Sequence, residues 1–214
     1  MAELIHRFSY SAILALALSA CAAGVPRADA PKASTSGAAE PAAAGPSVLV
    51  TEELGSPHIG ELAPDFELVD QSGAHVRLSA LRGAPVVLAF VTSFCPFSAA
   101  AQPYLASLAE QYAARGVRVV AVDVAEDDQA FAAYVSRMKL PFPVLRDADG
   151  ATSLRFTPTN ASPGVKDRRM VIVTSNLVID RDGRIRFFTL LDTTHFDAKL
   201  VHVRHALDQA LQAT

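Results

Sequence analysis

The sequence predicts an α/β fold, a three-layer sandwich with a mixed central sheet and helices on both faces. Residues 86–92 are a continuous apolar run rich in β-branched side chains, which is typical of a strand buried on both faces, and residues 117–124 are predicted to form a second buried strand. A helical pattern follows each run, and the chain then closes with a hairpin and an amphipathic helix. Strands that alternate with helices favour a sheet covered by helices.

The first half of this pattern begins with a short predicted hairpin. Its two arms, residues 66–69 and 75–78, flank the turn cluster at 70–73. After the strand at 86–92, a helix is predicted to begin at Pro96, because proline has its φ preset and lacks the N–H that the first turn leaves unpaired. Gly116 ends this helix where a left-handed residue is usually required.

The second half repeats the alternation. After the strand at 117–124, residues 127–138 have the apolar spacing of a helix with one buried face. Next come a short strand at 142–145, one or two helical turns at 151–156 and a loop at 157–169. Strands at 170–180 and 185–191 follow, joined by the turn Asp182-Gly183. The closing helix is predicted at 197–211, with Leu200, Val203, Leu207 and Leu211 inward.

Composition sets the broad class. The chain of 214 residues is 50% hydrophobic and 19% charged, which is enough apolar material for one substantial core. Its formal net charge of -3 argues against nucleic acid or an anionic membrane face as the main partner. The two cysteines, Cys21 and Cys95, lie in very different surroundings, and each suggests its own chemistry.

Residues 1–20 have the features of a targeting segment. Arg7 gives a modest positive start, and the apolar stretch at 12–20 is too short to span a bilayer core of about 30 Å. The segment ends in Leu18-Ser19-Ala20-Cys21, which resembles the lipobox of bacterial lipoproteins. That resemblance implies cleavage before Cys21 and acylation of its thiol. The alternatives are an ordinary secretory signal or an N-terminal anchor.

Residues 21–57 contain the cysteine expected to be lipidated and a stretch rich in Ala, Pro, Gly and Ser. With few large apolar side chains, this stretch predicts a flexible tether, and residues 58–214 form the domain. By resemblance to sorting rules in double-membrane bacteria, Ala22 favours the outer membrane. We therefore expect an exported domain, anchored by lipid to a bacterial membrane and facing the periplasm.

The segment Cys95-Pro96-Phe97-Ser98 follows the first buried strand and opens the helix. Its position makes Cys95 the residue that caps the helix, where unpaired N–H groups and the positive end of the helix dipole favour a thiolate. A thiolate is the form of cysteine that attacks disulfides and peroxides. The alternative is a buried cysteine that acts only as a small apolar side chain.

This segment resembles the active-site region of thioredoxin-like proteins, above all the TlpA-type and AhpC/TSA peroxiredoxin-like redoxins. Phe94, Cys95, Pro96 and the helical Pro103 occupy the family's positions, and the resemblance extends from about residue 60 to the C-terminus. It implies a thioredoxin fold and thiol redox chemistry. It also places Phe94, Pro96 and Phe97 along the groove that receives the substrate.

Two positions depart from the family pattern. Ser98 stands where the second cysteine would be, and Thr174 stands where a cis-proline would precede the penultimate strand. Ser98 cannot resolve a mixed disulfide, although its hydroxyl can form a hydrogen bond near Cys95. If Cys21 is lipidated, Cys95 is the one remaining thiol. The leading hypothesis is therefore monothiol exchange with protein or low-molecular-weight thiols and disulfides.

A one-Cys thiol peroxidase with an antioxidant role is the second hypothesis. By resemblance to peroxiredoxins, Thr92 fits the threonine three residues before the cysteine. Leu88 replaces the expected proline, and Thr174 stands at the register of the expected arginine. Arg168 and Arg169 lie nearby in the sequence. Thr92, Cys95, Ser98 and Thr174 are thus the candidate catalytic residues.

A third hypothesis is a redox-inactive binding module, which the two departures from the family pattern would permit.

We expect no cofactor and no metal. His195, His202 and His205 are interpreted as solvated histidines near the closing helix, because the two cysteines and the histidine of copper-binding relatives are missing. The acidic run at 126–128 is interpreted as a solvated helix start.

Overall fold

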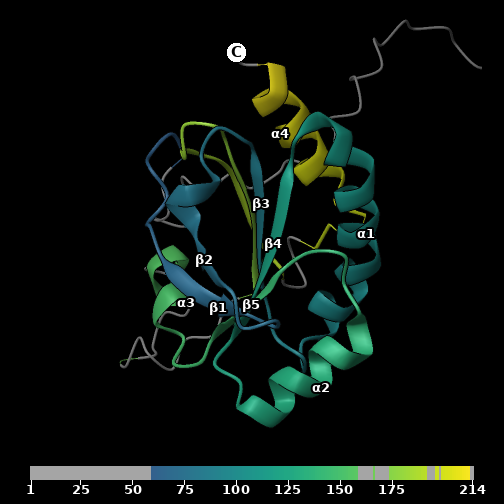
Figure 1. Ribbon diagram of the computed structural model, residues 1–214. Helices are drawn as coiled ribbons and strands as arrows, with labels where there is room; N and C mark the ends of the chain where they lie inside the picture. Colours follow the sequence, from purple (N-terminus) through teal and green to yellow (C-terminus); the bar gives the residue numbers. More distant parts are fainter. Residues whose placement is uncertain (1–58, 159–165, 167–173, 192–195, 198, 213–214) are drawn as a thin grey trace, which may run out of the picture. The chain divides into compact units, whose positions relative to one another are not determined.

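The central sheet has seven strands in the order β2-β1-β5-β4-β3-β6-β7 (Figure 1). The computed structural model describes residues 59–158, 166, 174–191, 196–197 and 199–212. The predicted targeting segment, the tether and Cys21 lie outside these residues, as do most of the predicted loop and the start of the strand predicted at 170–180. The predicted α/β class is confirmed.

Parallel and antiparallel pairs occur together in the sheet. β3 pairs in parallel with β4, and β4 with β5, whereas β1–β2, β1–β5, β3–β6 and β6–β7 are antiparallel. The strands are β1 (Glu67–Asp70), β2 (His75–Arg77), β3 (Val86–Val91), β4 (Arg118–Val124), β5 (Val144–Asp147), β6 (Ser175–Ile179) and β7 (Ile185–Leu190).

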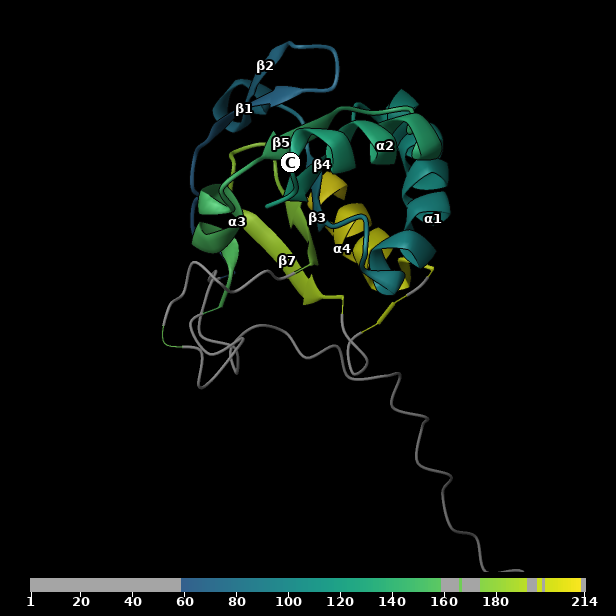
Figure 2. The same ribbon diagram turned by 90° about the horizontal axis from the view of Figure 1, so that it is seen from below.

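Helices cover both faces of the sheet, as Figure 2 shows with α1, α2 and α4 on one side and α3 on the other. The helices are α1 (Pro96–Tyr112), α2 (Asp128–Met138), α3 (Ala151–Phe156) and α4 (Val201–Gln212), with short 3-10 turns η1 (Leu78–Leu81) and η2 (Ala113–Arg115). None of the helices in the described residues is both long enough and apolar enough to cross a membrane.

Strand β3 lies between two hydrophobic cores, and all six of its residues are buried. Val87, Ala89 and Val91 contribute to the core under α1, α2 and α4. Leu88 and Phe90 contribute to the opposite core, which includes Phe156 of α3. The prediction that this apolar run is buried on both faces is confirmed, and it explains why every position in the strand is apolar.

The closing helix begins later than the sequence pattern predicts. Leu200 has a φ of 55°, a left-handed conformation directly before the first residue of the helix, Val201. Asp197 accepts hydrogen bonds from the backbone N–H groups of Leu200 and His202, and thereby satisfies donors at the start of the helix. Leu200, Val203 and Leu207 are fully buried, so the predicted inward face is correct although the start is four residues too early.

Candidate active site around Cys95

Cys95 caps helix α1 directly after the end of β3, as the sequence predicts. Its backbone is extended, with φ −80° and ψ 116°, and Pro96 is the first helical residue. The backbone N–H of Ser98 donates to the Cys95 Sγ at 3.5 Å. The side chain is partly exposed and forms no disulfide. The sulfur is therefore held by the helix start and remains within reach of solvent.

Thr174 provides the second contact to the sulfur, although it is 79 positions away in sequence. It directly precedes β6, and β6 pairs with β3, so strand pairing brings its hydroxyl within 3.5 Å of the Cys95 Sγ. The same hydroxyl lies 3.3 Å from the Leu191 carbonyl oxygen. Because a hydroxyl has one proton, it donates either to Leu191 or to the sulfur. A Cys95 thiolate requires the second arrangement, in which the Thr174 hydroxyl turns toward the sulfur.

These contacts lower the pKa of the Cys95 thiol. Partial burial is the largest single influence and raises that pKa, but the Thr174 hydroxyl, the backbone N–H and the hydroxyl of Ser98, and the backbone N–H of Phe97 together outweigh it. A hydrogen bond to the charged form of a group favours that form. The thiolate is therefore more populated at neutral pH than in a free cysteine, and the thiol is correspondingly more reactive.

The hydroxyls of Ser98 and Thr92 lie inside the domain. Each residue is 1% exposed, and neither hydroxyl has a hydrogen-bond partner within the described part of the chain. Ser98 contacts the sulfur through its backbone, whereas the Thr92 carbonyl accepts the Cys95 N–H at 3.4 Å. Both residues thus contact Cys95 by hydrogen bonds of their backbone groups.

Aromatic residues precede and follow Cys95-Pro96 in the chain. Phe94 is 69% exposed, which is unusual for a phenylalanine, and Pro96 is also exposed. The ring of Phe97 lies 4.9 Å from that of Phe196, measured between centroids. Of the three residues predicted to form a substrate groove, Phe94 and Pro96 are exposed and Phe97 is half-buried, all of them adjacent to Cys95 in the chain.

Glu126 contradicts the interpretation of the acidic run as a solvated helix start. It is only 7% exposed, and its carboxylate accepts the backbone N–H of Ser93 at 2.5 Å. The cause is Ala125, whose φ of 56° turns the chain inward after β4. Asp127 and Asp128 are exposed as expected, and Asp127 caps α2 by accepting the N–H of Ala130 at 2.8 Å.

Asp123 is a buried carboxyl group that the sequence analysis did not single out. It is 1% exposed at the end of β4, and neither of its oxygens has a partner among the described residues. Burial, and then the nearby charge of Glu126, raise its pKa to about 7, although Arg146 opposes them. An aspartate within the valine-rich stretch 119–124 was the available signal.

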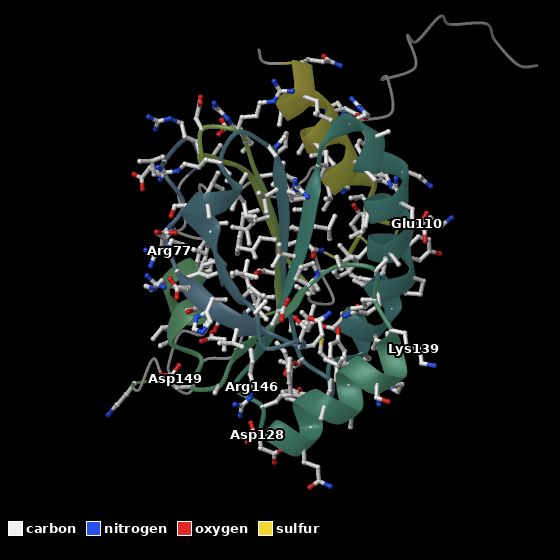
Figure 3. All side chains as sticks on the ribbon, in the orientation of Figure 1. Arg77, Glu110, Asp128, Lys139, Arg146 and Asp149 are labelled. Atoms are coloured by element: carbon white, nitrogen blue, oxygen red, sulfur yellow. The ribbon has the colours of Figure 1, made fainter. Side chains whose placement is uncertain are left out.

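A polar cluster lies near the loop at 92–95, which Glu126 contacts through Ser93; its members are the buried Gln102, Asp123, Glu126 and Tyr134 and the half-buried Arg146. Gln102 of α1 donates to the Tyr134 hydroxyl of α2. Arg146 of β5 extends outward to Asp128 at 2.6 Å, and the two labelled side chains lie together in Figure 3. These two contacts link α1 to α2 and β5 to α2.

Metal ligands do not gather around this site. Within the ranges that the structure describes, no three His, Cys, Asp or Glu side chains are placed to hold a metal ion. His202 is half-buried and lies 3.4 Å from the Asp197 carboxylate, whereas His205 is exposed next to Gln209. His195, like Arg168 and Arg169, lies outside the described residues.

Comparison with known proteins agrees with this arrangement. Residues 59–188 match the AhpC/TSA family. Thiol-disulfide oxidoreductase ResA of Bacillus thuringiensis subsp. konkukian is 28% identical over 127 residues, which cover 59% of this chain and 66% of that relative's length.

Two crystal structures resemble the domain. One is described as a thiol:disulfide interchange protein DsbE from Chlorobium tepidum; it is 26% identical, with a TM-score of 0.57, and the match covers 73% of this chain and 99% of that one. The other is peroxidoxin BcpB from Mycobacterium tuberculosis, 26% identical with a TM-score of 0.58, and the match covers 72% and 96% of the two chains. The chain therefore belongs to the AhpC/TSA family, and its described part is a thioredoxin-like redoxin domain.

Proposed function

We propose that this protein is a thiol–disulfide oxidoreductase that works through Cys95 alone. The observation that supports it most is the partly exposed sulfur at the start of α1, hydrogen-bonded by the Ser98 N–H and the Thr174 hydroxyl, with a lowered pKa. The names of the similar ResA and DsbE proteins support the same class of reaction.

The reaction has two exchange steps. The Cys95 thiolate attacks one sulfur of a protein or low-molecular-weight disulfide, forms a mixed disulfide, and releases the other sulfur as a thiolate. An external thiolate then attacks the partner's sulfur in the mixed disulfide, forms a new disulfide with it, and releases Cys95 as the thiolate. The second step needs the external thiol because the hydroxyl of Ser98 cannot replace it.

The exposed apolar surface supports a peptide as the substrate of the first step. Phe94 and Pro96 are exposed next to the sulfur, and Phe97 packs against Phe196 at its side. An extended peptide lying over these side chains would bury apolar area while its disulfide meets Cys95. In this proposal the hydroxyl of Thr174 stabilises the attacking thiolate.

Removing the Thr174 hydroxyl tests this role directly. Thr174→Val is expected to raise the Cys95 pKa by about one unit, because a hydrogen bond to a charged group contributes about 1.5–3 kcal/mol. The thiolate is measured by its ultraviolet absorbance as a function of pH, and exchange by its rate with an aromatic disulfide at pH 6. Thr189→Val is the matched control, since the Thr189 hydroxyl donates to the Leu190 carbonyl instead.

The proposal fails if the parent thiol reacts with the disulfide no faster than free cysteine does. Cys95→Ser supplies the background for that measurement. An unchanged Cys95 pKa in Thr174→Val would remove Thr174 from the mechanism but leave the reaction class intact.

Peroxide reduction is the second candidate, because the fold resembles a peroxidoxin and Thr92 lies three residues before Cys95. Within the described residues, however, the Thr92 hydroxyl is buried and the hydrogen bonds to the sulfur come from Thr174 and Ser98. Disulfide exchange therefore has the better geometric support. Rapid-mixing kinetics with hydrogen peroxide distinguish the two: a rate far above that of free thiol favours peroxidase chemistry.

We also propose that residues 1–20 are removed and that lipid on Cys21 attaches the domain, through the tether at 21–57, to a bacterial membrane facing the periplasm. The lipobox-like Leu18-Ser19-Ala20-Cys21 supports this, and Ala22 supports the outer membrane. Cys21→Ala is expected to abolish incorporation of labelled fatty acid and to release the protein from the membrane fraction. Incorporation that persists in this variant would contradict the proposal.

A further inference from the structure

Phe196 brings a second aromatic ring to the Cys95 site from a distant part of the chain. Its ring lies 4.9 Å from the Phe97 ring, measured between centroids, and the two ring planes are tilted by 60°. Tilted arrangements at this distance are among those that aromatic rings prefer. Phe97 is the second residue of α1, so this aromatic pair joins the first turn of the active-site helix to the segment before α4.

The segment that carries Phe196 is anchored to the domain by its neighbours. The next residue, Asp197, accepts the Leu200 N–H at 3.0 Å through its carbonyl oxygen and the His202 N–H at 2.7 Å through its carboxylate. Leu200 is fully buried in the core under α1, α2 and α4. The Phe97 ring therefore has a neighbour whose place is fixed by residues 197–202, and not by the active-site helix itself.

Apolar surface continues from the aromatic pair along the junction of α1 and α4. The two helices lie on the same face of the sheet (Figure 2), and Arg204 of α4 donates to the Gln111 side chain of α1 at 2.6 Å. Phe97, Tyr104 and Gln111 are spaced by seven residues, so they share one edge of α1. Val201 shares the corresponding edge of α4 with Arg204. Tyr104 and Val201 are 37% and 57% exposed, which extends the apolar surface away from the sulfur.

Charged side chains are missing from the α1 side of this surface. Residues 95–109 include no Asp, Glu, Lys, Arg or His. The exposed residues of that stretch are Pro96, Ala99, Ala100, Pro103 and Tyr104. On the other side of the Cys95 loop, by contrast, α2 begins at the exposed carboxylates of Asp127 and Asp128. A partner that is joined to Cys95 thus meets apolar surface toward α1 and α4 and charged surface toward α2.

We infer that Phe196 is a specificity-determining residue of the proposed disulfide exchange: with Phe97 it forms a fixed aromatic wall that favours partner peptides with large apolar side chains next to the reacting cysteine. A mixed disulfide holds the partner's backbone close to Cys95, so the partner's neighbouring side chains lie on the adjoining surface. Burial of an apolar side chain there is favourable, whereas a small hydrophilic side chain gains little. The inference rests on the proposed function and deepens it by naming the class of substrate.

Two peptides, each with one cysteine linked by a disulfide to nitrothiobenzoate, test this in a Cys21→Ser background. Cys95 attacks the peptide sulfur, forms the mixed disulfide and releases the coloured nitrothiobenzoate thiolate. One peptide has leucine and phenylalanine beside the cysteine, and the other has serine at the same positions. Each rate is divided by that of free cysteine with the same peptide, which removes differences in intrinsic reactivity.

The parent is expected to react about tenfold faster with the apolar peptide than with the serine peptide. Phe196→Ala is expected to reduce this preference to about twofold or less, while its rate with the serine peptide stays within about twofold of the parent. Phe97→Ala and the variant that lacks both rings are expected to lose the same preference, because the two rings act as one surface.

Leu62→Ala is the matched control. Leu62 is 52% exposed and pairs with Arg184 at the end of the sheet away from Cys95, so its loss is expected to leave the preference unchanged. Circular dichroism verifies that each variant is folded, and the ultraviolet titration of Cys95 verifies that its pKa is that of the parent. If Phe196→Ala does not fold, Phe196→Ser and Phe97→Ala decide.

Two results would overturn the inference: a full preference that survives in Phe196→Ala, or an equal fall in both rates, which would give Phe196 a structural role only. A parent that reacts with both peptides equally, and faster than free cysteine, would also overturn it but would leave the proposed function intact. A parent that reacts with neither peptide faster than free cysteine contradicts the proposed function itself.

Discussion

Ser98→Cys is expected to convert the one-thiol site into a dithiol site that releases a mixed disulfide from Cys95 at least about 100-fold faster than the parent does. The Ser98 backbone nitrogen already lies 3.5 Å from the Cys95 sulfur. Side chains three apart on a helix have Cβ atoms about 5–6 Å apart, which is close enough for a disulfide after small adjustments. An attack within one molecule replaces the need for an external thiol.

The measurement adds less than one equivalent of an aromatic disulfide that releases a coloured thiolate, in a Cys21→Ser background, and counts the thiolate released per disulfide molecule added. The parent is expected to release one equivalent and keep the second as a mixed disulfide. Ser98→Cys is expected to release both. Ser107→Cys, also on α1 but nine residues further along, is the control, and its added thiol is not expected to reach Cys95. One equivalent from Ser98→Cys would show that the buried side chain at position 98 cannot approach the sulfur.

Asp123→Asn is expected to remove a large part of the pH dependence of stability. The folded-state pKa of Asp123 is about 7, raised from 3.8 by burial first and by the charge of Glu126 second. A raised folded-state pKa stabilises the fold fully below the unfolded value, and this contribution is lost as pH rises through the folded value. Between pH 4 and pH 8 the parent is thus expected to lose about 4 kcal/mol of unfolding free energy from this group.

Urea unfolding at pH 4 and at pH 8 measures that loss. The asparagine variant keeps a neutral side chain at both values and is expected to show a much smaller difference. Asp182→Asn makes the same chemical change on the surface and is expected to follow the parent. If Asp123→Asn also follows the parent, Asp123 is charged in the folded protein at both pH values.

The two predictions rest on features of which some could be predicted from the sequence and others could not. The junction of β3 and α1 was predictable because its determinants are local. An apolar run buried on both faces, a proline at the first helical position and a glycine at the end fix the strand, the helix start and the cap. The Asp182-Gly183 turn between β6 and β7 was predictable for the same reason.

The contacts that tune the sulfur were not predictable in the same way. Thr174 stood out in the sequence as a departure from a family pattern, but its hydrogen bond to Cys95 exists because β6 pairs with β3 in one particular register. Glu126 looked like part of a solvated acidic run until the left-handed backbone of Ala125 turned it inward. The late start of α4 likewise follows from the left-handed backbone of Leu200.

The sequence by itself determined the order of the elements, the place of Cys95 at a helix start, and the absence of a second cysteine at position 98. Only the tertiary structure decided that a distant hydroxyl and a buried carboxyl pair surround the Cys95 loop. The physical reason is that backbone preference and apolar periodicity act over a few residues. Contacts between side chains far apart in the chain depend instead on strand register and on single residues with unusual backbone angles.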